Sequence, residues 1–268
     1  MTNIEIPKQF KDQFGMGTAA AVYPAKERRI LRIIAILVLL AVAAATAVSA
    51  VGIFMERWGR YYPPVILKAV LPDVVVCLGA LLLVLLILWG FFTSSKKAGV
   101  IYQNGFAYST FKGVQSWKWE NVRDITSSVL RQYTNGVYSG TIHIYILVNS
   151  QGEKIKLDDS LKDVEKMYDQ IHKNSFPYRY ERLANAYNSG KNVNFGTVSL
   201  SKTVGIQIGK KTYPWNEIEE VAIQNGMLSV KKKDGRWFSG AKSAVSLIPN
   251  LFVLLSIIDQ MVGIKAGK

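Results

Sequence analysis

The sequence has few of the residues that build cross-linked and catalytic sites. It contains one cysteine, Cys77, and two histidines among 268 residues. A single cysteine excludes a disulfide within the chain. The sequence also lacks an Asn-x-Ser/Thr glycosylation site with x other than Pro. Both absences fit a soluble part that faces a reducing, cytoplasmic compartment.

The two histidines, His143 and His172, have no second His, Cys or carboxylate at the spacing of a metal site. No Ser-His-Asp order occurs in the context of a nucleophile elbow. The stretch GIQIG at 205–209 lacks the further glycine and the helix that a dinucleotide loop needs. The pair Asp158-Asp159 stands where a helix is expected to begin, so capping explains it. We therefore expect a non-enzymatic protein with no catalytic residues, no metal and no cofactor.

Acidic residues are the minority among the charged side chains. There are 33 Lys and Arg against 19 Asp and Glu, which gives a net charge of +14. An excess of this size suits an anionic lipid surface, but it is equally typical of a solvated basic surface. Charge alone does not exclude nucleic acid. The sequence contains no specific nucleic-acid motif, so we do not expect that partner.

Two long uncharged runs, 33–54 and 74–92, stand near the N-terminus. Each is long enough to span a hydrocarbon core of about 30 Å at about 1.5 Å per residue. Pro72 is expected to begin the second helix, with Asp73 in its first turn. These features predict a two-helix transmembrane hairpin over 30–92. A cleaved signal peptide is the alternative, but its polar leader would be long and a second span follows closely.

Basic residues are unevenly distributed around the two spans. The outer ends carry more of them than the connecting loop does, which predicts that both termini and the soluble part lie in the cytoplasm. The flanking residues are Lys26, Arg28, Arg29, Arg32, Lys96 and Lys97, against Arg57, Arg60 and Lys68 in the loop. The expected location is therefore the cell membrane, with two spans. Residues 1–29 are expected to form a cytoplasmic polar tail.

After the second run, short alternating apolar stretches predict antiparallel strands. Two similar modules are expected, 94–173 and 193–265, each ending in a helix, with a linker helix over 174–192. Asp159 or Ser160 is expected to cap the first terminal helix, and Pro249 to open the second. Extra residues at 134–140 predict a longer hairpin in the first module. The apolar stretch LFVLLSII at 251–258 is expected to be buried between the modules.

The two modules share short phrases. A Gly followed by an apolar residue occurs at Gly105 and Gly205, and Trp-x-x-[Val/Ile] occurs at Trp119 and Trp215. We interpret these as packing positions of the sheet rather than as ligand contacts.

The phrases GVIYQNGFAYSTFKGVQSWKWENVRDI, 99–125, and WNEIEEVAIQNGMLSVKKKDGRW, 215–237, resemble uncharacterised membrane-tethered families with pleckstrin-homology-like (PH-like) domains. The resemblance implies a membrane-anchored α+β protein. It would consist of a transmembrane helical hairpin and two tandem PH-like modules, each a partial antiparallel barrel with a C-terminal helix. PH-like domains bind phosphoinositides, peptides or proteins, so the resemblance implies binding without naming the ligand.

Basic residues in the second module are the best functional lead. The candidate lipid contacts are Lys210, Lys211, Lys231, Lys232, Lys233 and Arg236. The alternative is that they are ordinary solvated lysines. The hypothesis is binding of an anionic lipid headgroup or a protein partner at the membrane. A structural or assembly subunit, including a homo-oligomer, is the second hypothesis, and an enzyme with an unrecognised site is the third.

Overall fold

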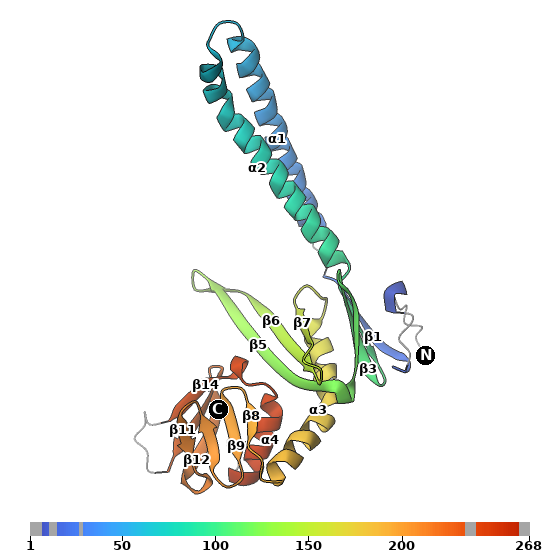
Figure 1. The fold of residues 1–268 in the computed structure, drawn as a ribbon, viewed down its shortest axis with the longest axis vertical. Helices are drawn as coiled ribbons and strands as arrows, with labels where there is room; N and C mark the ends of the chain where they lie inside the picture. The colour runs from blue at the N-terminus through green and yellow to red at the C-terminus, as the bar shows by residue number, and fades with distance from the viewer. Residues whose placement is uncertain (1–6, 11–14, 27–28, 234–239, 263–268) are drawn as a thin grey trace. The chain divides into compact units, whose positions relative to one another are not determined.

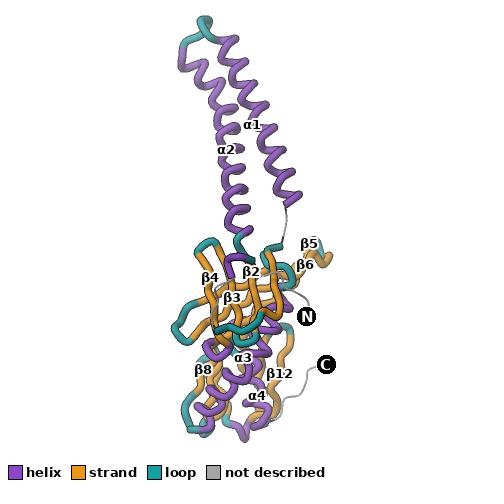
Figure 2. The backbone as a smooth tube through the Cα atoms, turned by 90° about the vertical axis from the view of Figure 1, so that its right-hand side faces the viewer, coloured by secondary structure: helices purple, strands orange, loops and turns teal. Residues whose placement is uncertain are grey.

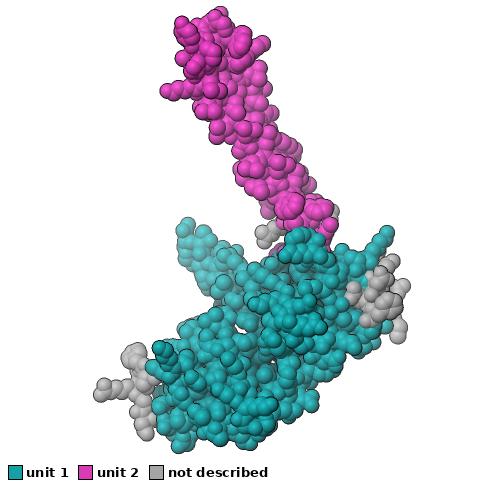
Figure 3. Space-filling view, viewed as in Figure 1, with its two compact units in different colours: residues 1–24, 98–268 teal, residues 25–97 magenta. Residues whose placement is uncertain are grey.

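A computed structural model describes residues 7–10, 15–26, 29–233 and 240–262. The chain divides into two units (Figure 3). Unit 1 comprises 1–24 and 98–268, and unit 2 comprises 25–97. Unit 2 is therefore an insertion in the sequence of unit 1.

Unit 2 is an antiparallel pair of long helices, α1 (Arg29–Arg57) and α2 (Pro63–Ser95) (Figure 1). Within them, Ile30–Arg57 and Pro63–Thr93 are long and apolar enough to cross a membrane. The expectation that Pro72 begins the second helix is wrong, because α2 begins at Pro63 and contains Pro72. A proline at the first helical position loses nothing, because its missing N–H would have no partner in the helix.

The first strand of unit 1, β1 (Ala19–Pro24), precedes α1 and pairs antiparallel with β2 (Ala98–Tyr102), which follows α2. The expectation of a polar tail is wrong for this segment. Upstream of β1, Phe10 and Met16 are buried against β2, and the Tyr102 hydroxyl donates a hydrogen bond to the carbonyl oxygen of Phe10 at 3.1 Å. Both faces of β2 are therefore covered, one of them by N-terminal residues.

The first half of unit 1 contains two antiparallel sheets. One has the order β1-β2-β3-β4, with β3 (Gly105–Thr110) and β4 (Gly113–Lys118). The other has the order β5-β6-β7, built from β5 (Val122–Thr134), β6 (Val137–Asn149) and β7 (Lys154–Asp158). Aromatic and aliphatic side chains such as Phe106, Trp117 and Leu147 form the core of this half.

A single helix, α3 (Val164–Asn188), serves both halves of unit 1. Its first part buries Met167 and Ile171 in the core of the first half, and its later part packs Phe176 and Leu183 against the core of the second half. The predicted boundary at 173 and 174 falls inside this helix. The expected linker helix is therefore a continuation of the first terminal helix, not a separate element.

The second half repeats the order of two sheets and a helix. One sheet runs β11-β10-β9-β8 and the other β12-β13-β14. The strands are β8 (Val193–Phe195), β9 (Val198–Ser201), β10 (Gly205–Ile208), β11 (Lys211–Tyr213), β12 (Ile218–Gln224), β13 (Met227–Lys232) and β14 (Ala241–Ala244). The final helix, α4 (Leu251–Val262), begins two residues after Pro249. The sequence also predicts that Gly263 ends this helix and that Lys233-Asp234-Gly235 forms a hairpin turn. Gly263 and the last two residues of that turn lie outside the described residues.

Helix α4 buries Val253, Leu254, Ile257 and Ile258 in the core of the second half, and it also contacts α3. The chain thus has two N-terminal apolar helices followed by antiparallel sheets and a C-terminal helix, an α+β architecture (Figures 1 and 2).

Candidate functional site

The two Trp phrases make the same local contact in both halves of unit 1. Trp119 begins the 3-10 turn Trp119–Asn121, and its indole N–H donates to the carbonyl oxygen of Gln103 at 2.8 Å. Trp215 begins the turn Trp215–Glu217 and donates to the carbonyl oxygen of Ser201 at 2.9 Å. Each indole ties the start of one sheet to a turn or strand end of the other. This geometry explains why the phrase occurs twice without invoking a ligand.

The two shared glycines stand where backbones approach closely. A Cβ at Gly105 would lie 2.3 Å from the carbonyl oxygen of Trp117, and one at Gly205 would lie 2.1 Å from that of Tyr213. Neither distance is sterically tolerable, so any side chain would push the two strands apart. Gly205 also has φ +110°, a conformation that glycine adopts at least cost.

Acidic neighbours partly neutralise the predicted basic cluster. The Lys231 ammonium lies 2.9 Å from a Glu219 carboxylate oxygen, and that of Lys232 lies 2.7 Å from a Glu217 carboxylate oxygen. Lys232 also lies 5.7 Å from the centre of the Tyr213 ring. The structure therefore places two of the predicted contact lysines in ion pairs.

Lys210, Lys211 and Lys233 are exposed, and the structure shows no ion pair between them and any described residue. Arg236 lies outside the described residues. The pairing of β12 with β13, which places Glu220 opposite Lys231, could have revealed the acidic neighbours. That pairing follows from the Asn225-Gly226 turn, a signal the sequence does contain.

His143 has a carboxylate partner that its sequence neighbours did not reveal. Its Nδ1 lies 2.9 Å from Oδ1 of Asp159, and its backbone N–H donates to Oδ2 of the same side chain at 2.8 Å. The expectation that Asp159 or Ser160 caps the helix is wrong, because Asp163 precedes its first residue. Among the described residues, no group of three or more His, Cys, Asp or Glu side chains could hold a metal ion.

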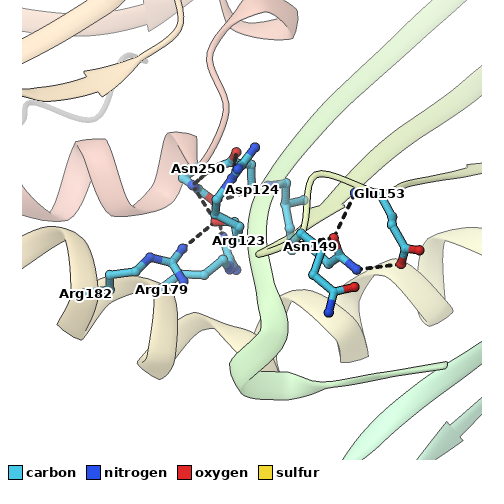
Figure 4. A network of polar contacts seen from close by, with 9 residues as sticks. Arg123, Asp124, Asn149, Glu153, Arg179, Arg182 and Asn250 are labelled. Atoms are coloured by element: carbon cyan, nitrogen blue, oxygen red, sulfur yellow. Dashed lines mark hydrogen bonds and ion pairs between the residues drawn. The ribbon is translucent and has the colours of Figure 1, made fainter.

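A buried polar network joins the two halves of unit 1 (Figure 4). Asn250, just before α4, accepts a hydrogen bond through Oδ1 from the Ile125 backbone N–H at 3.1 Å and donates its own backbone N–H to the Ile125 carbonyl at 2.8 Å. Its Nδ2 donates to the Arg123 carbonyl at 3.1 Å and to Asp124 at 2.9 Å. Asn250 thus pairs with β5 as a short extra strand would.

The same Oδ1 atom accepts a hydrogen bond at 2.8 Å from Arg179, whose side chain is fully buried on α3. A second guanidinium nitrogen donates to the carbonyl oxygen of His172 at 3.2 Å. Burial lowers the pKa of Arg179 to about 10, so it remains charged at neutral pH. Burial, with the nearby Arg179 charge, lowers the pKa of His172 to about 4, so this ring is neutral. Buried hydrogen bonds thus connect β5, α3 and the residue before α4.

An apolar groove of about 620 Å³ lies beside this network, between α3 and α4. Its walls are rings and aliphatic side chains, with a few polar groups at the rim. The lining residues are His172, Lys173, Phe176, Phe252, Leu255, Ser256 and Asp259. The groove could accept an apolar side chain from a partner. The Ser256 hydroxyl at its rim donates a hydrogen bond to the carbonyl oxygen of Phe252 at 2.8 Å.

A further candidate surface is the end of the β1–β4 sheet where β1 ends and β2 begins, which we call the connection end. The register Pro24↔Ala98, Ala98↔Ser109 and Thr110↔Gly113 places the β3–β4 turn at this end. The turn carries Phe111, whose side chain is 52% exposed, and Lys112, whose ammonium lies 5.8 Å from the Phe111 ring centre. An exposed aromatic beside a cation is suited to a membrane–water interface. Turn residues between two predicted strands indicated a turn here, but no pattern in the sequence distinguished Phe111 and Lys112 as a candidate contact.

Comparisons with known proteins identify a family but no activity. A search of curated proteins found no match. A family described as a family of unknown function, DUF6585, matches residues 1–264, close to the full chain. The chain belongs to this DUF6585 family.

Proposed function

We propose that the protein is a non-enzymatic membrane protein whose α1–α2 hairpin spans the bilayer twice. Unit 1 would lie on the cytoplasmic side and bind anionic lipid headgroups. The basic residues that flank the two helices favour this orientation.

The observation that carries the proposal is the pairing of β1 with β2. These strands are hydrogen-bonded neighbours, yet both long apolar helices lie between them in the sequence. Residues 24 and 98 must therefore be on the same side of a membrane, which requires an even number of crossings between them. Only 25–28 separate β1 from α1, and only 96–97 separate α2 from β2. Such short connections would hold unit 1 against the bilayer surface.

The repeated order of sheet, sheet and helix supports the proposal that the two halves are tandem PH-like modules. The matching contacts of Trp119 and Trp215, and of Gly105 and Gly205, support the same proposal. A double attachment to the membrane raises the local concentration of lipid around such modules, so weak headgroup contacts would suffice.

The lipid contacts we favour are Lys112 in the β3–β4 turn together with Lys210, Lys211 and Lys233, all exposed and with no ion pair to a residue that the structure describes. Each is worth about 1 kcal/mol near an anionic surface. Lys231 and Lys232 contribute less than their number suggests, because Glu219 and Glu217 already pair with them.

Hydrogen exchange of the full chain in lipid nanodiscs tests the proposal. The full chain is needed, because a fragment starting at residue 94 would lack β1 and expose an edge of β2. We expect 111–113 and 209–211 to exchange more slowly in discs containing anionic lipid than in neutral discs. Replacing Lys210 and Lys211 by Gln should abolish the difference at 209–211. The exposed Lys191→Gln is the matched control and should preserve it.

Two outcomes would refute different parts of the proposal. Extraction of the full chain from membranes by alkaline carbonate would show that α1 and α2 do not span. Equal exchange in neutral and anionic discs, with the chain firmly inserted, would exclude headgroup binding and leave the spans intact.

The groove between α3 and α4 favours a second candidate function, an assembly subunit that docks a protein partner. Phe252 lines this groove and is 49% exposed. If the groove docks a partner or a second copy, Phe252→Ser should release that protein in a pull-down from detergent. Lipid-dependent exchange should remain unchanged.

A further inference from the structure

The outer part of the β5–β6 hairpin, residues 129–141, has no role among those described so far; we call it the β5–β6 turn. Strand β7 pairs with β6 only between Ile144 and Val148, so the hairpin beyond these residues has no third strand. Its exposed part carries large apolar side chains instead of the charges that usually protect such segments. These are Val129, Leu130, Tyr133, Val137 and Tyr138, each more than half exposed.

The charge of this turn is equally distinctive. Residues 129–141 read VLRQYTNGVYSGT and contain one charged residue, Arg131, and no acidic residue. The Tyr133 and Tyr138 rings lie edge to face, with centres 6.0 Å apart. Tyrosines with apolar bodies and polar tips, a nearby arginine and no carboxylate are the composition of a membrane–water interface. A carboxylate there would be repelled by anionic headgroups, and this segment has none.

The position of the turn points to the same surface. Within unit 1, the β5–β6 turn lies at the same end as the connection end, as two perpendicular views show (Figures 1 and 2). The β3–β4 turn with Phe111 lies at that end too, by strand register. With two residues between α2 and β2, this end of unit 1 faces the bilayer if the helices span it.

We propose that the β5–β6 turn inserts its tyrosine and aliphatic side chains into the headgroup region of the bilayer. The β3–β4 turn supplies a second contact through Phe111. Together with the two helix connections, these contacts fix the tilt of unit 1 on the membrane. This inference rests on the proposed two-span anchoring.

Fluorescent labelling at a single cysteine tests it directly. Cys77 is the only native cysteine, so Cys77→Ala gives a background without thiols. In that background Val137→Cys carries an environment-sensitive dye, and the full chain is inserted into nanodiscs. The control is Val204→Cys, because Val204 is also a turn valine and is 52% exposed. Val137 itself is 70% exposed, so a dye at this position should be accessible to water unless lipid covers it.

We expect the dye at position 137 to shift to the blue in nanodiscs and to be quenched by lipid carrying a nitroxide. We expect the dye at 204 to be quenched only by aqueous iodide. Quenching of the 137 dye by iodide, and not by the nitroxide lipid, would overturn the inference. Protection of the 137 dye from both quenchers would also overturn it, because the turn would then be covered by protein.

Two controls keep the result interpretable. Replacing Tyr133 and Tyr138 by Ser, with the dye at Ser139→Cys, should restore iodide quenching without disturbing the strands behind the turn. Co-flotation of each variant with the lipid shows that α1 and α2 are inserted. If the chain floats with the lipid but iodide still quenches the dye, only the proposed contact of the β5–β6 turn is contradicted. If the chain does not float, the proposed membrane anchoring is contradicted.

Discussion

Asn250 offers the sharpest test of how the two halves of unit 1 are held together. The substitution Asn250→Gly removes the side chain but keeps the backbone conformation, since φ is 53° at this position and glycine adopts it freely. It leaves the buried Arg179 guanidinium with the His172 carbonyl as its remaining acceptor, and the Ile125 N–H without a partner. The lost side-chain interactions should therefore dominate the result, since the matched control below measures the effect of glycine on the freedom of the unfolded chain.

The expected loss follows from those two groups. A hydrogen bond to a charged group contributes about 1.5–3 kcal/mol, and an orphaned buried amide costs about 1–3 kcal/mol. Water that enters the vacated space recovers part of this. We therefore expect Asn250→Gly to lower the free energy of unfolding by roughly 3 kcal/mol.

Urea unfolding of the full chain in nanodiscs, followed by tryptophan emission, measures this change. The matched control is Asn225→Gly, at an exposed turn with φ 51°, which should shift the free energy of unfolding by less than about 0.5 kcal/mol. If the loss at Asn250 arises from the stranded charge, adding Arg179→Met should recover more than about 1 kcal/mol. Additive effects of the two substitutions, or a loss below about 1 kcal/mol for Asn250→Gly, would refute the reasoning.

Three further predictions concern single residues of unit 1. Burial lowers the pKa of His172 from 6.5 to about 4 on folding, so its contribution to stability is full above pH 6.5 and is lost as pH falls toward 4. At pH 5, urea unfolding should show a loss of roughly 1 kcal/mol in the free energy of unfolding after solvent screening, and this loss should be absent in His172→Gln. Gly205→Ala should lower the free energy of unfolding by more than about 2 kcal/mol in the same assay. Gly209→Ala is the control, because a Cβ there meets nothing within 4 Å, and it should cost only about 1 kcal/mol of backbone strain. Equal losses for the two variants would contradict the close approach of backbones at Gly205. Glu219→Gln removes the ion pair of Lys231, so the slowing of hydrogen exchange at 229–233 by anionic nanodiscs should be larger in this variant than in the unaltered protein. An equal slowing in both proteins would show that Lys231 does not contact lipid.

Local sequence patterns were enough for several elements. The two apolar runs predicted helices long and apolar enough to cross a membrane, and both are present in unit 2. Alternation predicted antiparallel strands followed by helices, because side-chain direction in a strand has a period of two residues wherever one face is buried. The Trp phrases stood out as well, because the same short phrase occurs twice and each Trp begins a 3-10 turn at its own position. The hydrogen bonds of the two indoles to Gln103 and Ser201 could not be predicted from the phrase.

The candidate sites depended on strand pairings, of which the sequence signalled only the β12–β13 pairing, through its Asn225-Gly226 turn. Glu217 and Glu219 neutralise lysines on a neighbouring strand, and Phe111 reaches the connection end only through the register of four strands. The length of the β5–β6 hairpin was anticipated, but which of its side chains remain exposed depends on where β7 stops pairing.

The sequence by itself determined the class of the elements: two long apolar helices, short alternating strands and terminal helices. Only the tertiary structure decided that β1 joins the sheet across the helical hairpin and that α3 runs through both halves. It also decided that Asn250 pairs with β5. The physical reason is range. Periodicity and turn chemistry act over a few residues, whereas these contacts join segments far apart in the chain and form only when the whole core of unit 1 is packed.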